Sequence, residues 1–425
     1  MWPFGQAILL FLVENILRRT FGYPQNHIHR CAESLRVRTL GGMNSNSSSA
    51  GARQARIPLN QPGTQGQPPV KIGSPAEILA AVPYLLGFHP TRSVVVIGTR
   101  PPRDRVHVTF RYDLLDPPEP GYASEIAAHA AAVLANQDVT AAIVAGYGPG
   151  ALVTPIAEEF RRHLTGAGLQ LREMLRVEDG RYWSYLCHEP GCCPADGMPF
   201  DVSVSAVAAQ MTLAGSVTLP DRAALERTVA PLAGVARASM RQATIRAENR
   251  AASLVAQAVR SGRKRREIVR PVADDGLRAV SQAIGAYRGG GRISQDDDIA
   301  RLTVALADLR VRDDAWARMD PEHTEAHQRL WTDVVRRAEP RYVPAPACLL
   351  AFTAWQAGNG ALANIAIARA LESDPGYTMA LLLFEAVGGG LPPSAARLPM
   401  TPEEVAASYA AGEGRRKPAR RRPPA

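Results

Sequence analysis

Hydrophobic positions divide the chain into two parts with different periodicity. In residues 71–219, short apolar or alternating runs are separated by alanine-rich or amphipathic stretches. Short apolar runs and period-two alternation predict strands, whereas apolar spacings of three and four predict helices. The expected strands are residues 93–98, 105–114, 139–145, 169–177 and 181–187, and the expected helices are residues 74–87, 122–136 and 154–164. This alternation predicts an α/β domain, a sheet with flanking helices.

The strand pattern stops near residue 220, and helical spacing continues to the C-terminal region. Helices are expected over residues 221–260, with a kink at Pro231, and over residues 274–287, 295–309 and 321–338. The fold class is therefore an α/β N-terminal domain followed by an all-α C-terminal half. The expected organisation is a disordered extension (1–70), an α/β domain (71–219), a helical region (220–343), a helical hairpin (344–395) and a basic, proline-rich tail (396–425).

Two helix boundaries have clear chemical signals. Ser74, Pro75 and Glu77 occupy the N-cap, first-turn and capping-box places of the first helix. Pro83 lies inside the same pattern and is expected to kink that helix or end it early. Pro155 is expected at the first position of the helix over residues 154–164.

Residues 344–377 match the spacing of one tetratricopeptide-like helix pair. Small residues fill the packing places of both helices, Gly358 and Asn359 fill the turn, and Pro375 closes the unit. No second copy is found, and a single unit cannot bury its own face. The pair is expected to pack on the preceding helices; the alternative is an open face that binds a partner protein or a second copy of the chain.

The basic charge of the chain belongs mainly to its two ends. The net charge is +9, of which residues 1–42 carry +3 and residues 411–425 carry +5, so the remainder is almost neutral. The tail is expected to make at most weak, non-specific contacts with anions. Residues 1–42 lack periodicity, and Met43 opens a Ser/Asn/Gly-rich stretch, so we expect Met43 to be the natural start.

Five cysteines, an odd number, in a long chain without a secretory signal favour a reducing, cytoplasmic environment with free thiols. The apolar stretch over residues 7–13 is too short to cross a membrane. No membrane association is therefore expected.

The most unusual chemistry lies between the last expected strand and residue 199. Cys187, His188, Cys192 and Cys193 place three thiols and an imidazole within seven residues. Zinc prefers four such ligands, usually from CxxC-type pairs, and the spacing here is C-x4-C-C. Three interpretations stay open: a metal site, a reactive or redox thiol site, and a rigid loop with half-buried cysteines.

A second candidate site lies at the strand–helix turn of residues 146–150. Gly146, Gly148 and Gly150 can expose backbone N–H groups to a phosphate, although any tight turn uses glycines for its geometry. His89 and Ser93 flank the start of the first buried strand. They can line a pocket at the mouth of that strand, or His89 can cap the preceding helix.

The pair His323 and His327 lies four residues apart on one expected helix, as paired metal ligands do. No third ligand is assignable, so two surface histidines are expected instead. No catalytic residue or cofactor can be assigned, and the sequence does not decide whether the protein is an enzyme.

Three long motifs together resemble a known family. They are SPAEILAAVPYLLGFHP (74–90), YWSY through CCP (182–194) and AWQAGNG through DPGY (354–377). The chain resembles the actinobacterial domain of unknown function 4192 family over residues 71–395. The resemblance implies a bacterial cytoplasmic protein and brings no activity. We expect an interaction or regulatory protein using its helical half; the alternative is a small-molecule binder or enzyme with a pocket near residues 146–150 and 187–193.

Overall fold

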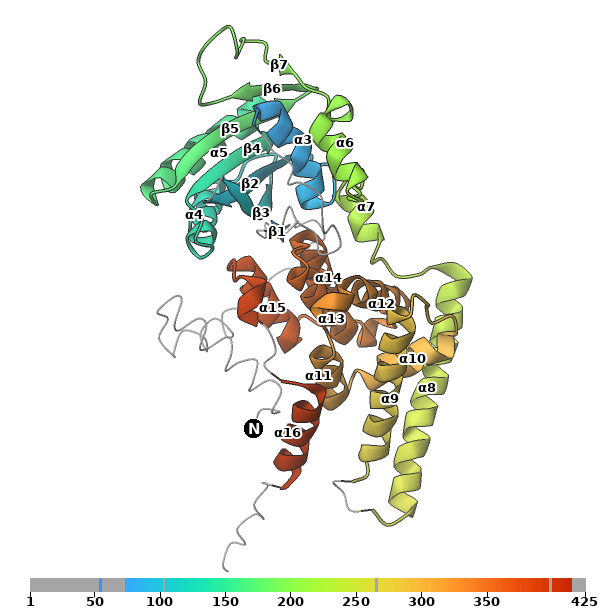
Figure 1. Cartoon of the computed structure of the whole chain (residues 1–425). Helices are drawn as coiled ribbons and strands as arrows, with labels where there is room; N and C mark the ends of the chain where they lie inside the picture. Colours follow the sequence, from blue (N-terminus) through green and yellow to red (C-terminus); the bar gives the residue numbers. More distant parts are fainter. Residues whose placement is uncertain (1–52, 56–72, 102–103, 264–266, 397–399, 415–425) are drawn as a thin grey trace, which may run out of the picture.

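The computed structural model describes residues 53–55, 73–101, 104–263, 267–396 and 400–414. A mixed β-sheet lies at one end of the molecule and a helical half at the other (Figure 1). The strands are β1 (Arg53–Ala55), β2 (Ser93–Arg100), β3 (Arg105–Asp113), β4 (Ala141–Tyr147), β5 (Gln170–Glu178), β6 (Arg181–Ser184) and β7 (Met198–Pro199). Their order in the sheet is β1-β3-β2-β4-β5-β6-β7.

Neighbouring strands are antiparallel except for β4 and β5, which run parallel. A parallel pair needs a long crossover, and helix α5 (Gly150–Gly166) supplies it. The expected strands are all present, and β1 and β7 are additional. The α/β fold class is thus confirmed.

Each face of the sheet is covered by different elements. On one face, α4 (Tyr122–Ala135) and α5 pack over the sheet, and Phe110 and Phe160 lie in their shared core. On the other face, α3 (Pro75–Leu86) packs through Leu79 against β4 and β5. Helix α6 (Ala206–Leu213), which the 3-10 turn η1 (Val202–Val204) precedes, packs against α3.

Helix α3 begins as the sequence predicts. The Ser74 side chain accepts from the Glu77 backbone N–H, and the Glu77 carboxylate accepts from the Ser74 backbone N–H, which completes the capping box. Of the two effects expected from Pro83, an early end is excluded, because the helix continues to Leu86 and ends near Gly87 as predicted. Gly87, with φ of 82°, ends it and donates to the Pro83 carbonyl.

The predicted start of the helix over residues 154–164 is wrong. Helix α5 begins at Gly150, so Pro155 lies inside the helix rather than at its first position. The turn after β4 leads directly into α5, and Pro149 is the residue before it. The missing N–H of Pro155 removes one hydrogen bond, which the rest of the helix compensates by burying Val153, Ile156 and Phe160.

The helical half begins with two helices separated by residues 228–233. This break replaces the kink expected at Pro231. The helices are α7 (Arg222–Arg227), α8 (Gly234–Arg260), α9 (Arg270–Arg288), α10 (Asp296–Ala305), α11 (Leu309–Ala317), α12 (Thr324–Arg337), α13 (Pro344–Gln356), α14 (Gly360–Ser373), α15 (Thr378–Gly388) and α16 (Pro402–Gly414). The short 3-10 turns are η2 (Pro321–His323), η3 (Pro340–Tyr342) and η4 (Pro393–Ala396).

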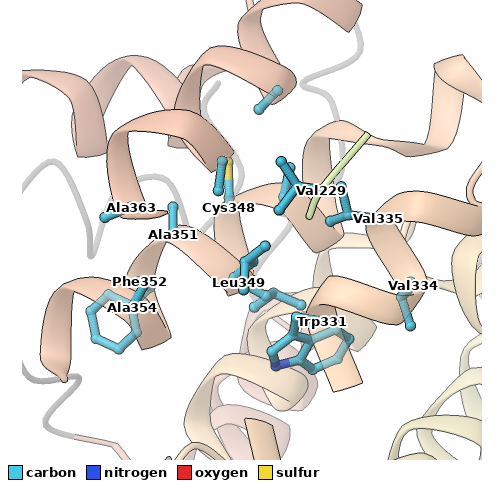
Figure 2. Packing of buried hydrophobic residues seen from close by; sticks show 14 of the residues in the cluster. Val229, Trp331, Val334, Val335, Cys348, Leu349, Ala351, Phe352, Ala354 and Ala363 are labelled. Carbon is cyan, nitrogen blue, oxygen red and sulfur yellow. The ribbon is translucent and has the colours of Figure 1, made fainter. Parts of the chain in front are cut away.

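The largest hydrophobic core crosses the expected boundary near residue 219. Val95 and Ile97 of β2 belong to the same cluster as Trp331 of α12 and Leu349 of α13. Figure 2 shows side chains from α12, α13 and α14 meeting in this core. The Asn136 side chain also donates to the Gly389 carbonyl at 3.2 Å. The α/β domain and the helical half are therefore packed together rather than joined only by a linker.

Helices α13 and α14 form the pair that matches the tetratricopeptide spacing. Gly358 has a φ of 78°, and the Asn359 side chain accepts from the Leu362 N–H at 3.0 Å, so the turn chemistry is as expected. Both helices are buried over most of their length. The likeness to a tetratricopeptide repeat stays a prediction, while the burial agrees with packing on the preceding helices.

The expected N-terminal extension and the expected C-terminal tail each contain an element of secondary structure. Strand β1 lies within residues 1–70 and pairs with β3. Helix α16 lies within residues 396–425 and packs near α11, where the Tyr409 hydroxyl donates to Asp313 at 2.6 Å. The expected division of the chain stays a prediction, although the pairing of β1 with β3 places residues 53–55 in the sheet rather than in a disordered extension. Residues 1–52, with both Met1 and Met43, and the basic residues 415–425 lie outside the described residues.

Every helix in the described part of the chain is either too short or too polar to cross a lipid bilayer.

Candidate functional site

The three neighbouring cysteines lie on the loop that connects β6 to β7. This loop extends from the end of the α/β domain that faces away from the helical half (Figure 1). Cys187 and Cys193 are partly exposed and Cys192 is exposed. The thiols are therefore accessible to solutes rather than buried in the core.

The base of this loop is held by Trp183 of β6. Its indole N–H donates to the Ala195 carbonyl at 3.0 Å, and Gly197 packs against the indole ring. Gly197 has a φ of 77°, and a Cβ there would lie 2.5 Å from the ring, so both geometry and space require glycine. Arg181 donates to the Gly197 carbonyl at 2.8 Å. These contacts hold residues 181–183 and 195–197 together at the base of the loop.

The three sulfur atoms converge at the tip of the loop. The Sγ atoms of Cys187 and Cys192 are 2.9 Å apart, and those of Cys192 and Cys193 are 3.9 Å apart. All three lie within 4.8 Å of one another. Among the described residues, this is the one group of three His, Cys, Asp or Glu side chains close enough to share a metal ion.

Backbone turns bring these sulfurs together. The Ser184 hydroxyl accepts from the Cys187 N–H at 3.1 Å and donates to the Glu173 carboxylate at 2.7 Å. The Glu189 carbonyl accepts from the N–H groups of Cys192 and Cys193 at 3.1 and 2.8 Å. These bonds form a tight turn across residues 189–193 and place Cys192 opposite Cys187.

The close approach makes the three thiols chemically unequal. Hydrogen bonds from Cys192 and Cys193 lower the pKa of the Cys187 thiol. The hydrogen bond to Cys187 raises the pKa of Cys192, and the hydrogen bond to Cys187 together with desolvation raises the pKa of Cys193 to about 12. Cys187 is therefore the first of the three to become a thiolate, and thiolates are the nucleophilic and metal-binding form.

His188 follows Cys187 but is not part of this group. Its side chain is exposed, and its ring nitrogens are not among the clustered ligand atoms. The structure brings together Cys187, Cys192 and Cys193 and leaves His188 outside. The three-thiol arrangement can bind a soft metal ion or form a disulfide within the loop.

The glycine turn of residues 146–150 is filled by the chain's own side chains. A Cβ at Gly146 would collide with Val153, and one at Gly148 would lie 2.9 Å from a Leu114 methyl group. At Gly150 it would collide with the guanidinium of Arg176. Close packing therefore accounts for these three glycines.

Arg176 connects the glycine turn to the base of the cysteine loop. Its guanidinium lies against Gly150 and also stacks over the Trp183 ring, 3.8 Å from the ring centroid. Such a cation–π contact is worth about 0.5–2 kcal/mol. The sequence did not indicate this role for Arg176, since no local pattern relates residue 176 to residue 183; only their pairing across β5 and β6 does.

His89 and Ser93 have different surroundings. His89 lies just after the C-terminal end of α3. Its Nε2 atom is 3.3 Å from the Thr218 hydroxyl, and its side chain lines an open groove. Ser93 begins β2, is fully buried, and its hydroxyl has no hydrogen-bond partner. Neither the cysteines nor the glycine turn lines the groove beside His89.

That groove lies between α3, the β5–β6 turn and α6. Its lining includes Tyr84, Phe200, Asp201 and Thr212, and the Tyr84 hydroxyl hydrogen-bonds that of Thr212 at 2.9 Å. These residues come from distant parts of the chain and form no sequence motif. They were therefore missed by reasoning from the sequence.

Exposed apolar side chains gather near α6 rather than on the helical hairpin. Val204, Leu213 and Val217 are each more than 80% exposed. Within residues 300–390, all of which are described, Phe384 is the one large apolar side chain that is exposed. A broad apolar face on that part of the helical half is absent.

His323 and His327 do not form two surface ligands. His323 contacts Asp320 at 2.8 Å, whereas His327 is 1% exposed and lies near Arg288 and Asp320. The expectation of two surface histidines is thus wrong for His327, because α12 turns that side chain toward α9. The positive charge of the nearby Arg288 guanidinium opposes the binding of a metal cation at His327.

The family model described as a domain of unknown function (DUF4192) matches residues 75–394. No curated protein and no solved structure is significantly similar to the chain.

Proposed function

Because the chain belongs to the DUF4192 family, whose description assigns no activity, we propose a function from the site itself. The protein is a metal-responsive regulatory protein that binds one zinc ion through Cys187, Cys192 and Cys193. The observation that carries this proposal is the convergence of the three Sγ atoms within 4.8 Å.

The spacing of the sulfurs supports a tetrahedral thiolate site. Zinc–thiolate bonds of about 2.3 Å place tetrahedral ligands about 3.8 Å apart. The observed separations of 2.9 and 3.9 Å lie on either side of that value. Small side-chain rotations in an exposed loop are sufficient to bring the three sulfur atoms to this tetrahedral spacing.

The electrostatics of the loop also favour this proposal. Cys187 has a lowered pKa, so a thiolate is available for the first metal bond. A bound divalent cation then displaces the protons of Cys192 and Cys193, since a coordinating thiol is deprotonated outright. Three protein ligands leave a fourth position for water or for an exogenous ligand.

The loop is linked to the groove beside α3, which supports a regulatory role. After Cys193, the chain pairs as β7 with β6 and reaches Phe200, whose N–H donates to the Gly180 carbonyl at 2.7 Å. Phe200 also packs edge-on against Tyr182 and lines the groove. Metal binding at residues 187–193 therefore acts on a short, paired segment that forms one wall of the groove.

The test is metal stoichiometry in reduced, full-length protein. After loading with zinc and removal of excess, we expect about one zinc per chain, and less than about 0.1 in Cys192→Ser. Replacement of zinc by cobalt should give thiolate-to-cobalt charge-transfer absorption. Absence of both signals in the wild-type protein would contradict the proposal.

Two variants serve as matched controls. Cys348→Ala removes the buried cysteine of α13, which is far from the loop in the fold, and should keep full zinc content. His188→Ala should also keep it, because His188 is outside the sulfur cluster. Loss of zinc in His188→Ala, with Cys348→Ala unaffected, would assign the fourth position to His188.

A second candidate function is the interaction through the helical half that the sequence suggests. The burial of α13 and α14 gives it little support, whereas the exposed Phe384 of α15 is the apolar residue through which it can be tested. Sedimentation of wild type and Phe384→Glu over a range of concentrations should show the same monomer mass. A concentration-dependent dimer that Phe384→Glu abolishes would restore the helical half as the interaction surface.

A further inference from the structure

We propose that Cys187 and Cys192 form a peroxide-sensitive thiol pair whose oxidation to a disulfide releases the metal from the loop. This inference concerns regulation of the same three-cysteine loop, and only its metal-release step rests on the proposed function. The supporting observations are the separation of the two sulfurs, their exposure and the greater distance of Cys192 from Cys193.

The first observation is the geometry of the pair. The two Sγ atoms are 2.9 Å apart, and a disulfide bond is about 2.0 Å long. Forming the bond requires an approach of less than about 1 Å. The residues are separated by a turn that the Glu189 carbonyl stabilises, so the loop already brings their side chains together.

The second observation is access. Cys192 is exposed and Cys187 is partly exposed, at the end of the molecule remote from the helical half. A small oxidant reaches both sulfurs without opening the fold. Cys348, in contrast, is fully buried within the core, and burial raises the pKa of its thiol.

The third observation is that Cys192 lies closer to Cys187 than to Cys193. The Cys192 Sγ is 2.9 Å from the Cys187 Sγ and 3.9 Å from the Cys193 Sγ. Because a disulfide needs the two sulfurs to come within about 2.0 Å of each other, Cys187 and Cys192 need the smaller movement.

The two steps balance as follows. The Cys187 thiolate attacks one oxygen of hydrogen peroxide, the O–O bond breaks, and the departing hydroxide takes a proton to become water. Cys187 is then a sulfenic acid. The Cys192 thiol loses its proton, its sulfur attacks the Cys187 sulfur, and the S–O bond breaks with release of a second water. Two thiols are oxidised by two electrons in total, and one peroxide is reduced.

Disulfide formation removes two of the three metal ligands. A single remaining thiolate, that of Cys193, cannot hold zinc against dilution. The oxidised loop therefore releases its ion, and a dithiol reductant restores the site. Zinc binding and peroxide oxidation both change the loop, and the paired segment after Cys193 connects the loop to Phe200 in the wall of the groove.

The first experiment uses metal-free, reduced, full-length protein. Treatment with one equivalent of hydrogen peroxide should give an intramolecular Cys187–Cys192 disulfide, located by peptide mass mapping. In Cys192→Ser, the yield of loop disulfide should fall at least about tenfold, and a dimedone adduct should appear on Cys187. Cys193→Ser should keep the disulfide. A Cys187–Cys193 bond in the wild type, or no loop disulfide at all, would overturn the inference.

The second experiment uses zinc-loaded protein with a chromogenic chelator. Peroxide should release zinc in parallel with disulfide formation, and Cys348→Ala should behave as the wild type. Formation of the disulfide in a protein that never binds zinc would contradict the proposed function while supporting the thiol pair. Retention of zinc after complete oxidation would contradict the release step alone.

Discussion

The cysteine loop between β6 and β7 and the helix pair α13–α14 are two conspicuous sequence motifs with opposite environments. The loop exposes three thiols to solvent and orders them by hydrogen bonds among themselves and to the backbone. The helix pair buries its cysteine, Cys348, among apolar side chains (Figure 2). The same residue type is thus a candidate ligand and nucleophile in one place and a small apolar side chain in the other.

The difference shows what each motif contributes. Burial raises the pKa of Cys348 and keeps it protonated, so α13 gains packing but no chemistry. In the loop, hydrogen bonds to a backbone carbonyl and between neighbouring thiols hold the cysteines in place, whereas packing in the core holds Cys348. Stability is therefore expected to depend on the helix pair, and reactivity on the loop.

The largest expected effect breaks the helix pair. Leu349→Ala removes a fully buried side chain of α13 and should lower the free energy of unfolding by about 2–5 kcal/mol, through lost burial and the cavity left behind. In metal-free protein, Cys192→Ser should change it by less than about 0.5 kcal/mol. Urea denaturation of both variants measures the two changes in the free energy of unfolding. Equal changes would contradict the expectation that stability depends on the helix pair and not on the loop.

A second prediction concerns the pH dependence of zinc binding by the loop. The pKa values of Cys192 and Cys193 are raised, so zinc must displace at least two protons near neutral pH. The apparent affinity should therefore fall by about 100-fold when the pH decreases by one unit. Competition with a chelator at pH 8 and pH 7 measures this change. An affinity independent of pH would indicate that thiolates are not the ligands.

A third and smaller prediction concerns the buried histidine of the helical half. Burial, with Arg288 nearby, lowers the pKa of His327 to about 4, against 6.5 in the unfolded chain. Above pH 6.5 both states are neutral; below it the unfolded state takes up a proton that the folded state refuses, so stability falls. The loss between pH 7.5 and pH 5 should be about 2 kcal/mol.

Denaturation of His327→Gln measures this contribution. The variant should show a shallower decrease in the free energy of unfolding over that pH range than the wild type. His323→Gln, which changes a more exposed neighbour, shows how much of the slope comes from the contact of His323 with Asp320 rather than from the buried ring of His327. An unchanged slope in His327→Gln would show that another group is responsible.

Local patterns predicted much of the secondary structure. The Ser74–Glu77 capping box, the strand pattern around Val95 and the turn at Gly358 depend on neighbouring residues and are present in the structure. The expected end of the first helix near Gly87 is confirmed, and Pro83 does not end it early, because packing of α3 against the sheet outweighs the hydrogen bond lost to proline. Strand β1 was missed because pairing with β3, not its own sequence, places it in the sheet.

The candidate site was only partly predictable. Close spacing identified Cys187, Cys192 and Cys193, since residues so near in sequence cannot be far apart in space. It also suggested His188, which lies outside the cluster. Arg176 and the groove residue Tyr84 carry no local signal, because their neighbours come from other strands and helices.

By itself, the sequence determined the order of helices and strands, the break into an α/β and a helical half, and the presence of a thiol-rich loop. These depend on periodicity, turn chemistry and spacing, which act over a few residues. Only the tertiary structure decided which thiols meet, that α5 and Arg176 fill the glycine turn, and that His327 is buried. Those outcomes depend on contacts between distant segments, where packing and desolvation determine the state of each side chain.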